Sequence, residues 1–279
     1  MGGGTEAAPA MRAKRSVAVF LSVLLMALPL MLTCLAAMLL PEATGENVYK
    51  KSGTTVDASN ASQGYIMVKQ NATGKKLKVQ ISLGNDTMTY NLNGDGEYEV
   101  FPLQLGNGKY RVQVFRNISG DRYTALSSIS FKAELQDEKL PFLYPNQYVN
   151  YEADSLAVVR ANELCGGMES GADKANAVYA YVVKNITYDY ILAKTVKTGY
   201  VPDLDSVVQK GMGICFDISA LIACMLRSQG VPTQLVIGYA DSAYHAWNLV
   251  YMNDQWLRCD ATSDICALTV NQYTTERRY

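Results

Sequence analysis

The sequence predicts an α+β fold in the C-terminal half of the chain, preceded by a small all-β region and an apolar N-terminal segment. Three observations support this prediction. Between about residues 54 and 135, short β-rich segments alternate with turn signals. From about residue 146 the hydrophobic period becomes helical, and three further β-rich segments close the chain. Residues 16–40 carry no charged side chain.

The composition excludes several classes of protein. The 25 Lys and Arg residues nearly balance the 26 Asp and Glu residues, and the formal net charge is −1. This balance provides no basic surface for a phosphate backbone, so we expect no nucleic-acid partner. A hydrophobic content of 49% is sufficient for a buried core and argues against a disordered chain. His245 is the only histidine and no Cys-x-x-Cys pair occurs, so we expect neither a metal site nor a cofactor.

The N-terminal segment, residues 1–45, reads as a targeting element. Its apolar run, residues 16–40, follows Arg12, Lys14 and Arg15, and as a helix it would span about 37 Å, enough to cross a bilayer. The basic flank predicts a cytoplasmic N-terminus. The run is either an uncleaved signal anchor or a signal peptide that is cleaved. Both alternatives place the rest of the chain outside the cytoplasm, in a cell-membrane protein or a secreted one.

The next region, residues 46–140, is expected to form a small β-sandwich. Residues 76–83 and 110–117 place apolar side chains at every second position, the period of a sheet with one buried face. Residues 93–96 and 106–108 are rich in Asn and Gly and predict hairpin turns. The expected strands cover residues 64–70, 76–83, 87–92, 98–105, 110–117 and 127–135.

A polar stretch with Pro141 and Pro145 predicts a linker into a second domain, residues 146–279. Ser170, with Asp173 three residues later, resembles a capping box and predicts a helix that continues to Asn185. A second helix is expected to begin near Gly213 and to end before Gly230 and Pro232. The strands that follow are expected over residues 234–239, 245–251 and 255–261.

Cys215 falls in the first turn of the second predicted helix. Free backbone N–H groups and the helix dipole favour an anion at that position, which suits a reactive thiolate. Cys224, nine residues later among apolar neighbours, fits a small buried hydrophobic residue instead. Cys215 is therefore the candidate nucleophile.

The predicted C-terminal hairpin brings two further candidates together. If Asn253 and Asp254 form a two-residue turn, His245 faces Thr262 on the opposite strand. Asp260 then lies on the same face as His245, one diagonal step away, at roughly 7–8 Å. A slip of one residue would turn Asp260 to the other face, so this placement depends on the turn length.

Cys215, His245 and Asp260 match the activated-nucleophile arrangement. In it, the His takes the thiol proton, the Asp fixes the orientation and tautomer of the His, and the thiolate attacks an acyl carbon.

Five segments around these residues, in this order, resemble the bacterial transglutaminase-like superfamily. The resemblance begins near Tyr188 and covers about the last ninety residues. Many relatives have a proline after the Asp, where this chain has Ala261. The five segments are Gly213–Leu221, Leu226–Pro232, Val236–Tyr239, His245–Asn248 and Trp256–Thr262.

The resemblance implies a papain-like core in which the Cys-bearing helix packs on an antiparallel sheet that carries the His and the Asp. By this resemblance, Cys215 is the nucleophile, His245 the general base and acid, and Asp260 the residue that orients His245. It assigns no oxyanion-hole donor beyond the backbone N–H of Cys215.

These features predict an extracytoplasmic cysteine-dependent acyl-transfer enzyme that acts on peptide or glutamine-type amides through a thioester. Water as the acceptor makes it a peptidase or amidase, and a lysine amine makes it a cross-linking transglutaminase. A protein or peptide substrate, including one associated with the cell wall, is the expected partner. The alternative is a non-catalytic cell-surface binding or envelope-organising protein. A disulfide between Cys259 and Cys266 is a separate hypothesis for an oxidising compartment.

Overall fold

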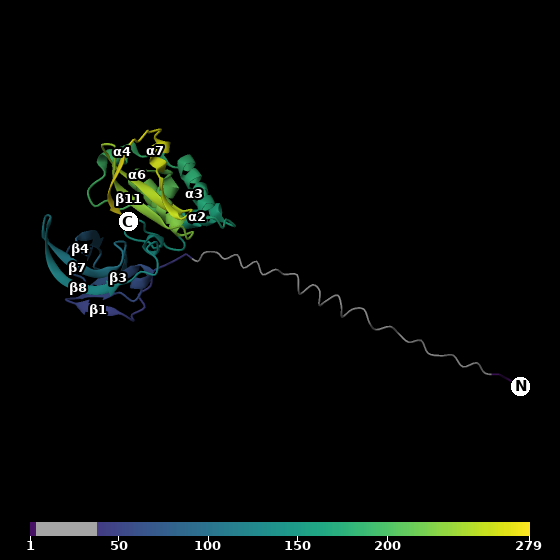
Figure 1. Cartoon of the computed structure of the whole chain (residues 1–279), viewed down its shortest axis with the longest axis horizontal. Coiled ribbons are helices and arrows are strands. Elements are labelled where there is room, and N and C mark those ends of the chain that lie inside the picture. Colours follow the sequence, from purple (N-terminus) through teal and green to yellow (C-terminus); the bar gives the residue numbers. More distant parts are fainter. Residues whose placement is uncertain (4–37) are drawn as a thin grey trace. The chain divides into compact units, whose positions relative to one another are not determined.

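A computed structural model describes residues 1–3 and 38–279 of the chain (Figure 1). The predicted apolar run at residues 16–40 and its basic flank lie outside this part, except for residues 38–40. Within the described residues, no helix is both long and apolar enough to cross a membrane.

The region after residue 46 contains two four-stranded antiparallel sheets that share one apolar core. Tyr90 of one sheet packs edge-on against Phe101 of the other, with ring centroids 5.4 Å apart. One sheet has the order β1 (Val48–Lys51), β2 (Thr54–Asp57), β3 (Tyr65–Gln70) and β6 (Glu99–Pro102); the other has the order β5 (Asp86–Leu92), β4 (Leu77–Leu83), β7 (Gly108–Ser119) and β8 (Arg122–Ala133). A short 3-10 helix, η1 (Ala61–Gln63), precedes β3.

The prediction of hairpins that turn at residues 93–96 and 106–108 is wrong. The first segment connects β5 to β6 and the second connects β6 to β7, and in both cases the two strands lie in different sheets. Turn residues signal that the chain reverses, but they do not specify which strand pairs with which. The tight hairpins instead turn at Gly53, Gly84 and Gly120, where positive φ angles of 77°, 59° and 52° favour glycine.

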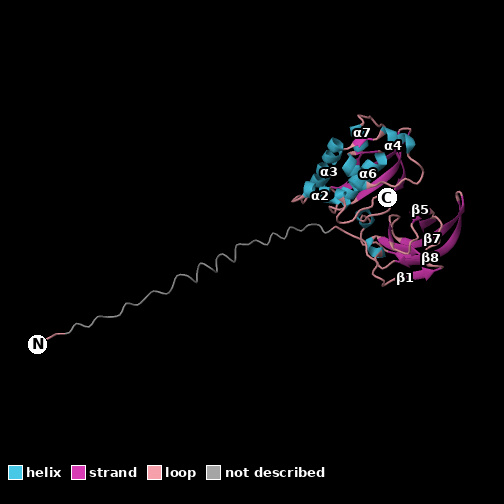
Figure 2. Cartoon of the chain, turned by 180° about the vertical axis from the view of Figure 1, so that it is seen from behind, coloured by secondary structure: helices cyan, strands magenta, loops and turns pink. Residues whose placement is uncertain are grey.

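The C-terminal part combines helices with a four-stranded antiparallel sheet, which confirms the α+β class (Figure 2). The sheet has the order β13 (Gln255–Cys259), β12 (Ala243–Met252), β11 (Thr233–Ala240) and β14 (Tyr273–Arg278). A short 3-10 helix, η2 (Leu140–Leu143), leads into this part. The helices are α2 (Leu156–Cys165), α3 (Gly171–Asn185), α4 (Tyr190–Thr195), α5 (Leu204–Lys210), α6 (Cys215–Arg227) and α7 (Ala261–Ile265), and a short parallel pair joins β9 (Thr187–Tyr188) to β10 (Met212–Gly213).

Helix α6 is the centre of this part and packs against β11 and β12 (Figure 1). Its residues from Asp217 to Arg227 are all buried, including the fully enclosed Ile218, Leu221 and Met225. At its start, the backbone N–H of Ile214 donates to the carboxylate of Asp217 over 2.9 Å, so a side chain satisfies one of the donors that precede the helix. The predicted helix over this segment is confirmed.

The last residue of α6, Arg227, is buried, and no Asp or Glu carboxylate among residues 38–279 forms an ion pair with it. Its guanidinium donates to three backbone carbonyls: that of Thr233 at 2.9 Å, that of Tyr144 at 2.8 Å and that of Tyr279 at 2.7 Å. Burial lowers its pKa to about 10, so Arg227 remains charged at neutral pH. One cation therefore holds the end of α6 against β11, the segment after η2 and the end of β14.

The hairpin of β12 and β13 has the predicted two-residue turn. Asn253 and Asp254 have φ angles of 53° and 60°, and Tyr251 pairs with Trp256. The ladder ends at Cys259, however, and Ala261 begins α7. The strand expected to continue to residue 261 is therefore too long, and the expected pairing of His245 with Thr262 does not form.

Strand β14 was not expected from the sequence, and it adds an edge to the sheet beside β11. Gly238 permits this pairing, because a Cβ atom there would collide with the carbonyl oxygen of Thr274. The register shifts between Ile237 and Gly238 at the same point. The close approach places Tyr273, the first residue of β14, beside the hairpin end that carries Asp260.

Candidate active site

Cys215 is the first residue of α6, as predicted, and its side chain is partly exposed. The N–H groups of a first helical turn have no partners within the helix, and they point towards the space beyond its N-terminus. The thiol therefore lies where a negative charge is favoured. Cys224, on the same helix, is completely buried, and burial raises the pKa of its thiol.

The structure brings His245 and Asp260 together. Nε2 of His245 lies 2.9 Å from Oδ2 of Asp260, and both side chains are at least 90% buried. Because Nε2 is engaged by the carboxylate, the imidazole has Nδ1 free to face the thiol. The side chain of Cys215 is among the groups that raise the pKa of His245, so the thiol lies near the imidazole. The three candidates named from the sequence thus form one connected cluster.

Asp260 reaches His245 by a different route from the one expected. It is the N-cap residue of α7 rather than part of a strand, and its Oδ1 accepts from the backbone N–H of Ser263 over 3.1 Å. Oδ2 accepts from the hydroxyl of Ser263 at 2.6 Å and from that of Tyr273 at 2.8 Å, besides His245. Four donors therefore fix this carboxylate.

These contacts determine the protonation states of Asp260 and His245. Burial opposes ionisation of Asp260, but the hydrogen bonds from His245 and Ser263 outweigh it and lower the pKa of Asp260. Burial likewise lowers the pKa of His245, while the hydrogen bond with Asp260 and the neighbouring Cys215 outweigh burial and raise the pKa to about 9. At neutral pH the structure therefore favours a carboxylate and an imidazolium.

Raising the pH is expected to remove the stabilisation that His245 contributes. Its pKa is about 9 in the folded chain, against an ordinary histidine value of 6.5, so the folded state binds this proton more tightly. The contribution is complete below about pH 6.5 and is lost as the pH rises through about 9. The measurement is the thermal midpoint of wild type and His245→Gln from pH 6 to 10. The difference between the two chains should shrink over this window, and parallel curves would contradict the prediction.

Sequence reasoning missed the role of Ser263 and of Tyr273. Ser263 stands three residues after Asp260, the spacing of an N-cap with its N3 residue, so the sequence held a signal for it. Tyr273 comes from a separate strand and had no local signal. Its ring packs edge-on against Trp247, with centroids 5.0 Å apart, and Arg258 lies 4.1 Å from its centroid on a ring face.

Trp247 and Asn248 support the site without touching the thiol in any contact observed. Trp247 is buried, and its ring stacks near the imidazole of His245, with centroids 6.1 Å apart. The amide of Asn248 donates to the carbonyl of Ser219 in α6 over 2.9 Å and to that of Gln234 in β11 over 3.2 Å. Asn248 thus ties the Cys-bearing helix to the sheet that carries His245.

The remaining cysteines do not form the disulfide hypothesised from the sequence. Cys259 and Cys266 are both free thiols, as are the other described cysteines. Cys259 ends β13, whereas Cys266 follows α7, and the hydroxyl of Tyr190 lies 3.9 Å from the sulfur of Cys266. The hypothesis assumed an extended strand up to residue 261, whereas helix α7 lies between the two cysteines. The geometry assumed for their pairing was therefore wrong. Among residues 38–279, no cluster of His, Cys, Asp and Glu could hold a metal ion.

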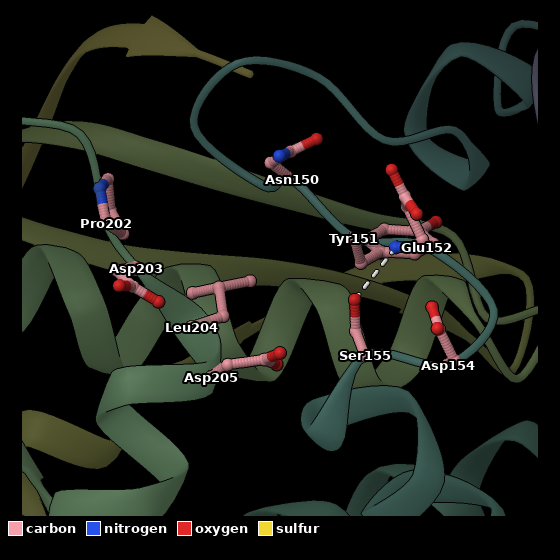
Figure 3. Close-up of a pocket in the computed structure, with 9 residues that line it drawn as sticks. All are labelled: Asn150, Tyr151, Glu152, Asp154, Ser155, Pro202, Asp203, Leu204 and Asp205. Atoms are coloured by element: carbon pink, nitrogen blue, oxygen red, sulfur yellow. Dashed lines mark hydrogen bonds between the residues drawn. The ribbon is translucent and has the colours of Figure 1, made fainter.

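A cavity of about 500 Å³ lies apart from these residues, and Figure 3 shows its lining. Four acidic side chains line it, but two of them already accept hydrogen bonds from backbone N–H groups at helix N-termini. Asp203 accepts from the backbone N–H of Ser206 at 3.1 Å, and Asp205 accepts from that of Leu156 at 2.9 Å. The lining residues are Asn150, Tyr151, Glu152, Asp154, Ser155, Pro202, Asp203, Leu204 and Asp205, so the candidate catalytic residues do not line this cavity.

Residues 159–261 match the family model described as the transglutaminase-like superfamily. No curated protein matches the chain. Among solved structures, one described as a TGase is 24% identical, with 42% of this chain and 32% of that chain covered and a TM-score of 0.33. The chain thus spans about a third of that structure's length.

Two bacterial structures resemble the chain over a longer stretch. A protein from Cytophaga hutchinsonii, described as a candidate cysteine protease, is 15% identical, with 84% of this chain and 86% of that chain covered and a TM-score of 0.39. The periplasmic domain of TgpA from Pseudomonas aeruginosa is 16% identical, with 81% of this chain and 77% of that chain covered and a TM-score of 0.38.

Proposed function

We propose that this protein is a cysteine-dependent acyl-transfer enzyme that acts on amides of peptides, because residues 159–261 match the family model of the transglutaminase-like superfamily. The observation that carries the proposal is the position of His245, which binds Asp260 at 2.9 Å and lies near enough to Cys215 for the thiol to raise its pKa. Nucleophilic catalysis by a thiol requires a base within hydrogen-bond reach and a third group that orients the base.

The reaction begins with attack of the Cys215 sulfur on the amide carbonyl carbon. As the S–C bond forms, the C=O π electrons move to oxygen and produce a tetrahedral oxyanion. When that intermediate collapses, the C–N bond breaks and the imidazolium of His245 gives its proton to the departing amine. Asp260 holds the ring in the tautomer that presents Nδ1 to sulfur and nitrogen. The product on the enzyme is a thioester.

The acceptor in the second step decides between hydrolysis and cross-linking. His245, now neutral, takes a proton from water or from an amine, which attacks the thioester and releases Cys215. We propose hydrolysis as the principal outcome, since the side chain of Cys215 is partly exposed and water has access to it. The proposed substrate is a protein or peptide, including one associated with the cell wall.

The proposal includes a location outside the cytoplasm. It is supported by the uncharged run at residues 16–40 and by the preceding Arg12, Lys14 and Arg15. As anchor or as cleaved signal, this segment would carry residues 46–279 across a membrane.

The test of thiol activation is the rate of iodoacetamide labelling as a function of pH, with the modified cysteine located by mass spectrometry. We expect fast labelling at Cys215 at pH 7, where an ordinary thiol with a pKa of about 8.5 is mostly protonated. His245→Ala should slow labelling at pH 7, because the imidazolium that stabilises the thiolate is removed. Labelling of Cys215 no faster than that of a denatured chain would reject an activated nucleophile and favour a binding role.

A further inference from the structure

One oxygen of Asp260, Oδ2, is shared by three hydrogen-bond donors. The hydroxyl of Ser263 lies 2.6 Å from it, that of Tyr273 lies 2.8 Å from it and Nε2 of His245 lies 2.9 Å from it. An oxygen that accepts several donors divides its negative charge among them, so each donor weakens its hold on the others. The strength with which Asp260 binds the imidazolium therefore depends on its other two donors.

Ser263 and Tyr273 contribute to this oxygen in different ways. Ser263 belongs to α7, and both its backbone N–H and its hydroxyl bind the carboxylate of the cap residue, one to each oxygen. These two contacts restrain the orientation of the carboxylate. Tyr273 adds one donor from a separate strand, β14, at the oxygen that binds His245. Its main effect is therefore on the charge of that oxygen.

Asp241 holds the segment that carries Tyr273. It lies in the turn between β11 and β12, the strand of His245. Its Oδ1 accepts from the backbone N–H of Gln272 over 3.0 Å and from that of Asn271 over 3.2 Å. Its own N–H donates to the carbonyl of Gln272 over 2.8 Å. The residue before Tyr273 is thus fastened to the hairpin that carries His245.

The surroundings of the Tyr273 ring favour donation by its hydroxyl. The ring packs edge-on against Trp247, and the guanidinium carbon of Arg258 lies 4.1 Å from the ring centroid. A cation beside the face of a phenol attracts its π electrons, which makes the O–H group a better donor. Burial and the hydrogen bond to Asp260 raise the pKa of Tyr273, so the phenol keeps its proton at neutral pH. The hydroxyl therefore acts as a donor and not as a base.

The proposed reaction requires His245 to hold a proton and then to release it. Asp260 stabilises the imidazolium, but a hold that is too strong slows proton transfer to the departing amine. Against the effect of burial, the hydrogen bonds from His245, Ser263 and Tyr273 lower the pKa of Asp260 and make it a weaker base. Without the hydroxyl of Tyr273, more of the negative charge would act on the imidazolium, and His245 would be a weaker acid.

We propose that Tyr273 is a positioning residue that acts through Asp260: its hydroxyl takes up part of the charge on Oδ2 and so limits the hold of the carboxylate on the imidazolium of His245. This inference rests on the proposed acyl transfer. His245 receives its proton from the thiol of Cys215 and gives it to the amine. No proton leaves Tyr273 in any step, and the phenol changes only the ease of the transfer.

Other charged or titratable groups surround the pair, and the loss of one hydroxyl leaves their charges unchanged. Asp264 of α7 accepts from the hydroxyl of Tyr179 in α3 at 2.6 Å. Cys259 ends β13, and burial raises the pKa of its thiol to about 12, so it stays neutral. The groups near His245 and Asp260 are Cys215, Tyr179, Arg258, Cys259, Asp264 and Tyr273.

The test is an NMR titration of His245 in the full chain. His245 is the only histidine, so the proton on its ring Cε1 gives one signal to follow from pH 6 to 11. For Tyr273→Phe we expect the midpoint to rise by about 0.5–1 pH unit, because Oδ2 loses a competing donor. A fall towards about 6.5 would show that the hydroxyl mainly keeps Asp260 in contact with His245. An unchanged midpoint would show a structural role alone, and either result overturns the proposal.

Tyr179→Phe is the matched control. The hydroxyl of Tyr179 also contacts α7, but it donates to Asp264 at 2.6 Å and to the backbone carbonyl of Asp260 at 3.4 Å. Because it does not bind the carboxylate of Asp260, we expect no rise in the midpoint of His245. A rise as large as that of Tyr273→Phe would show that any loosening of α7 shifts the titration, and would overturn the proposal.

Turnover links the titration to the reaction. The substrates are a blocked glutaminyl-glycine peptide and a casein digest. On whichever of them wild type processes, Tyr273→Phe should lose about 3- to 10-fold in kcat with KM within about twofold, since the phenol acts on proton transfer and not on binding. A raised midpoint with the wild-type kcat would overturn the proposal. If wild type processes neither substrate faster than Cys215→Ala, the proposed function fails even where the midpoint rises, so the two failures are distinguishable.

Discussion

Replacement of Cys215 by alanine is expected to abolish turnover, with a loss of at least about 10⁴-fold, because no other group can form the thioester. A suitable measurement uses a blocked glutaminyl-glycine peptide. Ammonia release in water reports hydrolysis of the side-chain amide, and hydroxamate formation with added hydroxylamine reports transfer to an amine. A casein digest, followed by new amino termini, reports peptide-bond cleavage. Together the three readouts also separate amidase, transferase and peptidase activity.

Cys224→Ala is the matched control for this variant. It removes a thiol from the same helix, nine residues further on, where the side chain is completely buried. Activity should persist in the folded fraction of Cys224→Ala. Turnover by Cys215→Ala at the wild-type rate, on any substrate that wild type processes, would refute thiol catalysis.

The second large effect is expected at Arg227, far from the thiol. Replacement by methionine keeps much of the apolar stem but leaves the buried carbonyls of Thr233, Tyr144 and Tyr279 without this donor. Each unsatisfied buried acceptor costs about 1–3 kcal/mol, so we expect the free energy of unfolding to fall by about 3–5 kcal/mol. Urea denaturation measures this loss.

Tryptophan fluorescence can follow the denaturation, because both tryptophans, Trp247 and Trp256, lie in the hairpin of β12 and β13. Arg160→Met provides the control. Arg160 lies on α2 and its ion pair with Glu163 is exposed, so its loss should cost no more than about 1 kcal/mol. Equal losses of unfolding free energy in the two variants would show that the three carbonyl contacts of Arg227 stabilise the fold no more than an exposed ion pair does.

Local signals in the sequence predicted the hairpin and the helix that carries Cys215 well. The adjacent Asn253 and Asp254 tolerate positive φ, so the turn length and the register of β12 with β13 followed from two residues. The helix that begins at Cys215 followed from its apolar stripe and from the Gly and Pro after it. In both cases residues close in sequence determine the geometry.

Asp260 lies beside His245, as the sequence analysis expected, but through a partly different geometry. The extended pattern of residues 255–259 was continued two residues too far, whereas the N-cap pairing of Asp260 with Ser263 ends the strand. The cap signal was present in the sequence and competed with the strand pattern. It prevailed because it satisfies the backbone N–H of Ser263 at the start of α7.

Tyr188 and Tyr273 mark what the sequence alone could not supply. Tyr188 lies opposite Gly213 through parallel pairing with a segment 25 residues later. Tyr273 reaches Asp260 through a strand that docks only because Gly238 lacks a side chain. Neither pairing leaves a periodic signal near the residue concerned. Long-range contacts of this type are specified by the packing of the whole sheet.

The double use of the Asp260 carboxylate links catalysis to local stability. One oxygen caps the short helix α7, while the other orients His245. Fraying of α7, a helix of only five residues, therefore releases the imidazole while the sheet and α6 stay folded. On heating, catalytic turnover should disappear below the temperature of global unfolding. In a hydrogen-exchange experiment, the backbone amide of Ser263 should become exposed through local opening of α7. The rate of this opening should equal the rate at which active molecules become inactive.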